Sequence, residues 1–248
     1  MRFTRTLFFL WVLLSSVCAN GQVGDHRSDF SVGFNGGYAM STVGFTPKVT
    51  QSSHGGVTGG LSFRYVCEKY FNTICSVYGE VNYTQMGWKE DIATEDRQPV
   101  INPVTGQPEA YSRTLNYVQV PLFAHLAWGR ETKGFQFFVQ AGPQFGYLIN
   151  ESTESNFNFD DRNMDDRSNK VCAQDTMAVE NKFDYGIAVG AGLEWSIPRV
   201  GHFLLEGRYY YGLGNIYGDS KRDYFAKSNH NCIMVKLTYL FDISRTKK

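Results

Sequence analysis

Strict alternation of apolar residues with polar or small residues is the feature that most restricts the fold of this chain. It is clearest over residues 183–195, where Phe, Tyr, Ile, Val, Ala, Leu and Trp occupy the odd positions and Asp, Gly, Ala and Glu the even ones. Successive side chains of a β-strand point to opposite faces, whereas a helix repeats every 3.6 residues. This segment therefore predicts a strand with two unlike faces.

Seven further segments show the same period of two. They cover residues 30–40, 57–65, 77–85, 116–128, 135–149, 203–213 and 231–241. The connections between them alternate long and short, the short ones being residues 66–76, 129–134 and 196–202. This arrangement is typical of membrane barrels. We predict an all-β fold, an eight-stranded antiparallel up-and-down transmembrane β-barrel over residues 30–241, with short periplasmic turns and long extracellular loops.

The composition agrees with a β-rich fold and excludes several other classes. Aromatic residues make up 15% of the chain and 25 of the 248 residues are Gly. No apolar run approaches the roughly 20 residues of a membrane-spanning helix, so a bundle of such helices is excluded. Lys and Arg balance Asp and Glu at 24 each, which gives no reason to expect nucleic acid as a partner.

The N-terminus has the pattern of an export signal. Arg2 and Arg5 precede an apolar stretch at residues 7–14, and small residues follow at 19–21. This predicts a cleavable signal peptide over residues 1–21, too short to act as a spanning helix. An uncleaved anchor helix is the alternative, and bulky Val17 disfavours a lipoprotein at Cys18. Residues 22–29 are then a short periplasmic segment and residues 242–248 a C-terminal tail.

Eight strands can also form a soluble barrel of the lipocalin type, with the apolar face inward around a ligand. Two features favour the membrane. The polar faces combine many glycines with few charges, which suits a narrow lumen better than a surface in water. Aromatic residues of the apolar face gather at both strand ends, as at bilayer interfaces. The predicted aromatic girdles are Tyr65, Trp128, Trp195, Tyr239 and Phe241 at the short-turn end, and Tyr83, Tyr147, Phe183, Tyr185 and Tyr211 at the long-loop end.

Several short motifs resemble one family of membrane barrels. They are NYVQVPL at 116–122, GEVNYTQMG at 79–87, AGP at 141–143, GAGL at 190–193 and YYYGL at 209–213. In order and spacing they look like the PorT-like outer-membrane β-barrel family, with similarity from about residue 30 to 241. The resemblance implies an eight-stranded barrel in the outer membrane of Gram-negative cells, but no particular function. The member that names the family is linked to a protein-secretion system, and no residue here carries that role across.

Charged residues on the inward parity are candidate lumen residues. They are Arg64, Glu80, Glu194, Glu206, Arg208 and Lys236. An unpaired charge inside a narrow barrel would be costly, so we expect these acids and bases to pair. They could form a polar path or gate. We favour a salt-bridged plug, since an eight-stranded barrel has an interior just wide enough for side chains.

No other pattern predicts catalysis, a cofactor or a metal. His125 falls in the half of its strand away from the long loops, which favours a lumen hydrogen bond over catalysis on outer-leaflet lipid. The acidic loop at residues 150–182 matches no defined calcium loop. Nucleotide-binding motifs and the GxSxG nucleophile motif are absent from the sequence.

Four cysteines follow the predicted signal peptide, and an oxidising compartment permits disulfides. Their spacing matches no zinc site. Cys67 and Cys75 flank one short turn, whereas Cys172 and Cys232 lie on the long-loop side. A cross pairing would have to span the membrane, so we predict the disulfides Cys67–Cys75 and Cys172–Cys232.

These observations predict a non-enzymatic outer-membrane barrel with a largely occluded, salt-bridged lumen. It would serve as a structural or surface-binding component of the envelope. Outer-membrane lipid and lipopolysaccharide are its expected partners, and other envelope or secretion proteins are further candidates. Three alternatives stay open: a small-solute channel, a lipid-modifying enzyme and an accessory component of a protein-secretion system.

Overall fold

The computed structural model describes residues 25–131, 133–218 and 223–245, and strands dominate them. The strands are β1 (Asp25–Thr46), β2 (Gln51–Ser52), β3 (His54–Tyr70), β4 (Thr73–Glu90), β5 (Tyr111–Gly129), β6 (Gly134–Ser155), β7 (Phe183–Ile197), β8 (Gly201–Gly212) and β9 (Lys227–Ser244). A short 3-10 helix, η2 (Ala173–Asp175), lies between β6 and β7. No helix in the described ranges is long and apolar enough to span a membrane.

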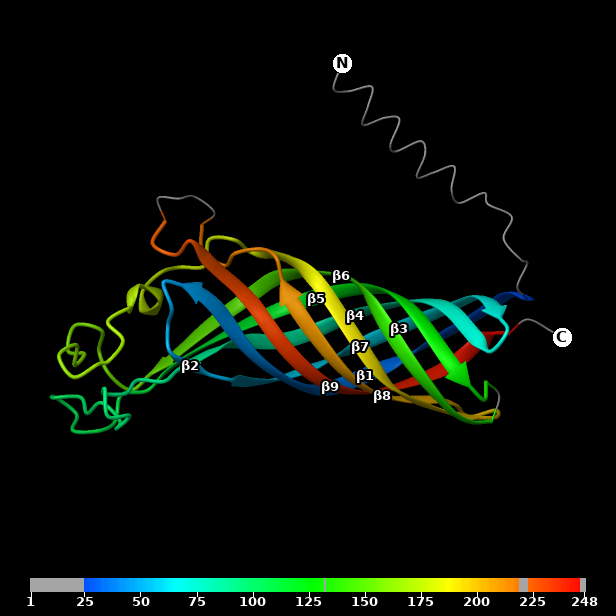
Figure 1. The fold of residues 1–248 in the computed structure, drawn as a ribbon, viewed down its shortest axis with the longest axis horizontal. Helices are drawn as coiled ribbons and strands as arrows, with labels where there is room; N and C mark the ends of the chain where they lie inside the picture. The colour runs from blue at the N-terminus through cyan, green and yellow to red at the C-terminus, as the bar shows by residue number, and fades with distance from the viewer. Residues whose placement is uncertain (1–24, 132, 219–222, 246–248) are drawn as a thin grey trace, which may run out of the picture.

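The eight long strands close into a ring. Each pairs antiparallel with the next long strand along the chain, and β1 also pairs with β9. The two-residue β2 adds to the far end of β4. The β3–β4, β5–β6 and β7–β8 turns lie at the end where β9 finishes, and the long loops gather at the opposite end (Figure 1). The predicted all-β, eight-stranded antiparallel barrel is confirmed.

The two faces of the wall differ as the alternation predicts. On β7, Ile187, Val189 and Leu193 point outward and are 53%, 48% and 53% exposed. Asp184 and Glu194 point inward on the same strand and are 4% and 1% exposed. The apolar side chains therefore cover the outside of the barrel, and the lumen contains the polar ones.

Most strands extend beyond the predicted segments. The increase is largest at the long-loop end, where β4 continues to Glu90 and β6 to Ser155. At the short-turn end, β1 begins at Asp25, inside the predicted periplasmic segment 22–29, and β9 ends at Ser244, inside the predicted tail 242–248. Hydrogen-bonded pairing continues there over residues that are mostly polar, which is why the alternation missed it. The predicted signal peptide, residues 1–21, lies outside the described residues.

Candidate functional site: the lumen and the loop across its mouth

Arg208 is the centre of an ionic cluster in the middle of the lumen. Its Nη1 lies 2.7 Å from Glu80 Oε2, and its Nε lies 2.7 Å from Glu206 Oε1. Lys236 Nζ also contacts Glu80 Oε2, at 2.6 Å. All four side chains are at most 3% exposed. The cluster therefore contains two bases and two acids that neutralise one another away from water.

This cluster crosses the full width of the barrel. Arg208 lies on β8 and Glu80 on β4, and three strands separate β4 from β8 in either direction around the ring. The Arg208 guanidinium also lies over the Phe123 ring, 4.6 Å from its centroid. Glycine on the inward face leaves the necessary space, because a Cβ on Gly190 would lie 2.5 Å from Glu206 Oε1.

A second bridge crosses the lumen nearer the short turns. Arg64 Nη1 on β3 donates to both carboxylate oxygens of Glu194 on β7, each at 2.8 Å. β3 and β7 are also opposite strands of the ring. His202 contacts Glu194 through Nδ1 at 2.7 Å and Asp242 through Nε2 at 3.2 Å. A cavity of about 250 Å³ lies at this end, and Arg64 and Glu194 are among its lining residues.

A third contact spans the barrel towards the long loops. The Tyr117 hydroxyl on β5 lies 3.1 Å from His230 Nε2 on β9, and these strands too are opposite one another. Both side chains are at most 1% exposed. The lumen is thus crossed at three levels: Arg64 to Glu194, Arg208 to Glu80, and Tyr117 to His230.

His125 lies on the inward face of β5 and is 1% exposed. Its ring stacks against Tyr78 and Phe138, with centroid distances of 5.7 Å and 4.8 Å. Its Nδ1 lies 3.0 Å from Gln140 Oε1, and the Gln140 amide donates to Glu206 at 2.7 Å. His125 is therefore placed in the hydrogen-bond network of the central cluster.

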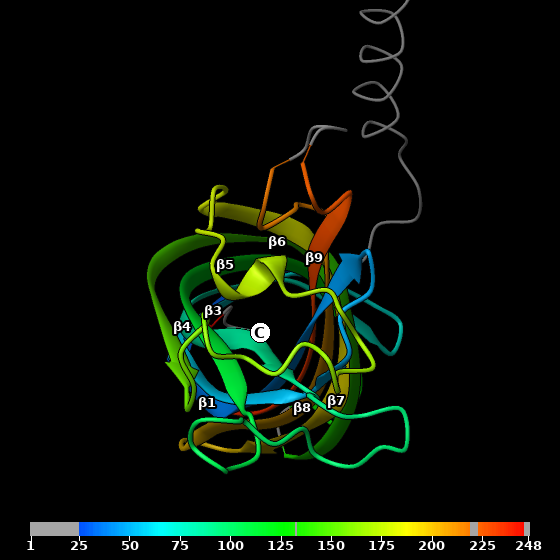
Figure 2. The ribbon, with the colours of Figure 1, turned by 90° about the vertical axis from the view of Figure 1, so that its left-hand side faces the viewer.

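The β6–β7 loop (residues 156–182) crosses the mouth of the barrel at the long-loop end (Figure 2). Arg113 of β5 holds it by donating to the Met177 carbonyl at 2.6 Å and to the Gln174 carbonyl at 3.3 Å. The Gln174 side chain is fully buried and donates to Glu90 Oε1 of β4 at 2.6 Å. The loop is therefore attached to the barrel by buried polar contacts.

Two arginines of this loop neutralise its acidic surroundings. Arg167 Nη2 lies 2.7 Å from Glu109 Oε2, and Arg162 Nη1 lies 3.0 Å from Asp175 Oδ2. Burial alone would raise the pKa of Glu109, but hydrogen bonds from the Asn163 backbone, Arg167 and Asn102 together lower it below its ordinary value. Across the described ranges, no group of three or more His, Cys, Asp or Glu side chains is placed to hold a metal ion.

The alternation of apolar and polar residues did not predict an aromatic cluster that lies beneath the β6–β7 loop. Its members are Phe45, Trp88, Tyr217 and Phe225, which the alternation had assigned to connections. Phe45 makes ring contacts with Trp88 at 5.3 Å, Tyr217 at 6.3 Å and Phe225 at 4.9 Å. Trp88 is two residues beyond Met86 on the same inward face of β4. Continuing the period of two past Met86 would have found it.

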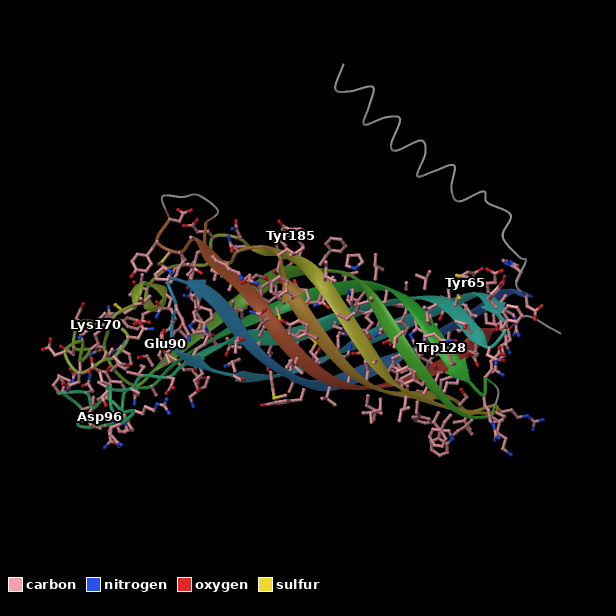
Figure 3. The ribbon with its side chains drawn as sticks, viewed as in Figure 1. Tyr65, Glu90, Asp96, Trp128, Lys170 and Tyr185 are labelled. Atoms are coloured by element: carbon pink, nitrogen blue, oxygen red, sulfur yellow. The ribbon has the colours of Figure 1, made fainter. Side chains whose placement is uncertain are left out.

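The ten predicted girdle residues all point outward from the wall. At the short-turn end the outward aromatics form a nearly continuous row of ring contacts, which includes Trp195 with Phe203 at 6.4 Å and Phe203 with Tyr239 at 5.0 Å. At the long-loop end, the ring centroids of Phe183 and Tyr185 are 6.2 Å apart. Figure 3 places Tyr65 and Trp128 near the short turns and Tyr185 nearer the long loops. The remaining members are Tyr83, Tyr147, Tyr211 and Phe241.

The predicted disulfides are not present, because all four cysteines are free: Cys67, Cys75, Cys172 and Cys232. A β-bulge between Val66 and Glu68 puts Glu68 rather than Cys67 opposite Cys75. Cys232 is buried in β9, with its Sγ 3.8 Å from the next carbonyl oxygen. Cys172 lies in the loop just before η2. The two cysteines of each predicted pair lie at the same end of the barrel, but their sulfur atoms are not bonded.

Comparison with known proteins adds a family match. A model of the family described as "Outer membrane protein beta-barrel domain" matches residues 20–218, which include β1 to β8. Similar solved structures include Ail of Yersinia pestis in complex with the heparin analogue sucrose octasulfate, at 15% identity over 86% of this chain and 99% of that chain, with a TM-score of 0.37. OprG of Pseudomonas aeruginosa is 13% identical over 89% of this chain and 99% of that chain, with a TM-score of 0.44. Neisserial surface protein A is 11% identical over 88% of this chain and 100% of that chain, with a TM-score of 0.41. No curated protein sequence matches the chain.

Proposed function

This chain belongs to the outer membrane protein β-barrel domain family, and we propose that it is a non-conducting, non-enzymatic barrel that displays its loop assembly at the cell surface. The observation that carries this proposal is the pair of ionic bridges across the barrel, Arg208 to Glu80 and Arg64 to Glu194. Each joins opposite strands, so each obstructs the lumen at its own level. The protein then acts as a structural or surface-binding component of the outer membrane.

The geometry of the mouth supports the second half of the proposal. The β6–β7 loop is held over the barrel by Arg113 and Gln174 instead of standing free. A loop fixed by buried contacts loses less conformational freedom when it binds, which favours recognition of a partner. Lipopolysaccharide surrounds the long-loop end of an outer-membrane barrel, and we propose it as the first partner, with other envelope proteins as further candidates.

We also propose that the chain lies in the PorT-like part of the family. The support is the set of motifs at 79–87, 116–122, 141–143, 190–193 and 209–213. Two of them contribute lumen residues described above, since Glu80 lies in the first and Tyr117 in the second. We propose no secretion role on this basis.

Conductance tests the non-conducting state directly. We expect purified wild-type protein in planar lipid bilayers to give no steps above the bare membrane. The matched variant replaces four bridging side chains together: Arg64→Ser, Glu80→Ser, Glu194→Ser and Arg208→Ser. Removing these side chains widens the lumen at two levels, so this variant should leak more ions than wild type. Steady wild-type conductance equal to that of the variant would contradict the proposal.

A further inference from the structure

A pair of carboxyl groups lies at the contact between the β6–β7 loop and the barrel wall. Glu90 is the last residue of β4, seven positions beyond the girdle residue Tyr83 and so outside the membrane-spanning part of the strand. Asp175 is the last residue of η2. Both side chains are buried, and their carboxyl groups lie close enough for each to shift the pKa of the other. The pair joins the loop to the wall.

Hydrogen bonds from the surroundings reach one oxygen of each carboxyl. Glu90 Oε1 accepts from Gln174 Nε2 at 2.6 Å, and Asp175 Oδ2 accepts from Arg162 Nη1 at 3.0 Å. Asp175 Oδ1 is buried, and among the described residues it has no donor. Its neighbour is the Glu90 carboxyl, and two ionised carboxylates can only accept. One proton between them would supply the missing donor.

Other charges also act on the pair. Arg162, bound to Asp175 Oδ2, favours the ionised form of Asp175, and Arg167 near both carboxyls favours both ionised forms. Glu109 near Asp175 opposes ionisation. Tyr111 donates to the Asp175 carbonyl at 3.4 Å and carries no charge there. Arg167 is already bound to Glu109 through both Nε and Nη2, at 3.1 Å and 2.7 Å. It is therefore only partly available to compensate a second negative charge.

We propose that one proton shared by Glu90 and Asp175 fastens the β6–β7 loop over the mouth, so that the loop is tightly closed in acidic medium and loosens in alkaline medium. When the proton leaves for solvent, two adjacent carboxylates repel each other and the donor to Asp175 Oδ1 is lost. This inference goes beyond the proposed surface role, because it states the condition under which the surface is assembled.

The direction of the pH dependence follows from the pKa values. Burial and the negative charge of Asp175 raise the pKa of Glu90 from 4.5 to about 8. Burial also raises the pKa of Asp175. Between about pH 4.5 and 8, Glu90 is therefore protonated when the loop is docked and ionised when the loop is released. Docking is strongest below this window and weakens by at most about tenfold per pH unit through it.

Tryptophan quenching measures the closure. Trp88 is fully buried, and the Arg113 guanidinium, which holds the loop, lies 5.7 Å from its ring centroid. In protein beginning at residue 22, the substitutions Trp128→Phe and Trp195→Phe leave Trp88 as the single tryptophan. We expect quenching of Trp88 by neutral acrylamide to rise several-fold from pH 6 to pH 9. Glu90→Gln should remain weakly quenched at both values, because an amide donates without titrating.

Two further variants complete the test. Asp175→Asn should also abolish the pH response, and it substitutes for Glu90→Gln if that protein does not fold. Glu95→Gln removes an exposed carboxyl from the neighbouring loop and should leave the response as in wild type. Quenching independent of pH in wild type, or an unchanged response in both amide variants, would overturn the proposal. Conductance is not part of this measurement, so the proposed function can fail separately.

Discussion

Replacing Arg208 with Met should destabilise the barrel by about 3–5 kcal/mol, the cost of removing one partner from a buried ionic cluster. Met fills a similar volume, so the loss reports charge and not a cavity. Glu80 would keep Lys236 as a partner at 2.6 Å, but among the described residues Glu206 would keep only the Gln140 amide as a hydrogen-bond donor, at 2.7 Å. The measurement is the free energy of unfolding in urea, with the protein folded into lipid vesicles.

Restoring neutrality should recover much of that loss. In the double variant Arg208→Met with Glu206→Gln, the carboxylate left without a base becomes an amide, and we expect about half of the stability to return. Arg245→Met is the matched control. Arg245 pairs with Asp242 at the rim and its side chain is 48% exposed, so its removal should cost less than about 1 kcal/mol. Equal losses for Arg208→Met and Arg245→Met would show that the central cluster is not isolated from water.

A charge on the outer wall should have the second largest effect. Val189 lies near the middle of β7, between Tyr185 and Trp195, and its side chain points away from the lumen. Arg at this position would face acyl chains, and we expect Val189→Arg to cost about 2–4 kcal/mol in vesicles. The reason is the free energy of bringing a guanidinium into hydrocarbon.

The control for this variant is Val200→Arg in the turn between β7 and β8. Val200 is 49% exposed, about as much as Val189, but it lies beyond the short-turn girdle. There the same substitution should cost at most about 1 kcal/mol. If Val189→Arg were as mild as Val200→Arg, the outer wall would face water.

The sequence predicted the barrel because the bilayer imposes a strict rule on each strand. Residues such as Ile187 and Val189 must be apolar, while inward Glu194 is free to be charged, and this contrast is visible in any single strand. The loops in water obey no such rule. The extensions of β4 to Glu90 and of β6 to Ser155 carry no apolar residue on their outer faces, so the alternation ended before the strands did.

The sequence predicted which charged residues lie in the lumen, but it did not predict which of them form ion pairs with one another. Parity assigned the six charged residues to the lumen, yet it gave no rule for choosing partners across the ring. Arg64 meets Glu194 and Arg208 meets Glu80 because opposite strands are staggered by the tilt of the barrel, which depends on the register of every pair between them. The same limit applies to the cysteines, where one β-bulge separated Cys67 from the position opposite Cys75.

The loop contacts could not be predicted at all from local pattern. Gln174 and Asp175 occur in a polar segment without periodicity, and they meet Glu90 only because the loop folds back over the mouth. Long-range contacts of this kind depend on the whole tertiary structure. The buried arginines Arg113 and Arg167 were equally hidden, since a sequence does not show which surface charges become enclosed.

Spin labels along β7 test most directly the claim that the apolar face meets lipid and the ionic face turns inward. In a cysteine-free variant, single labels are placed at 187, 189 and 193, with a fourth at Lys170 in the β6–β7 loop. We expect high collision rates with oxygen and low rates with a water-soluble nickel complex at the three strand positions, and the reverse at 170. Nickel accessibility at 187, 189 and 193 as high as at 170 would contradict this claim.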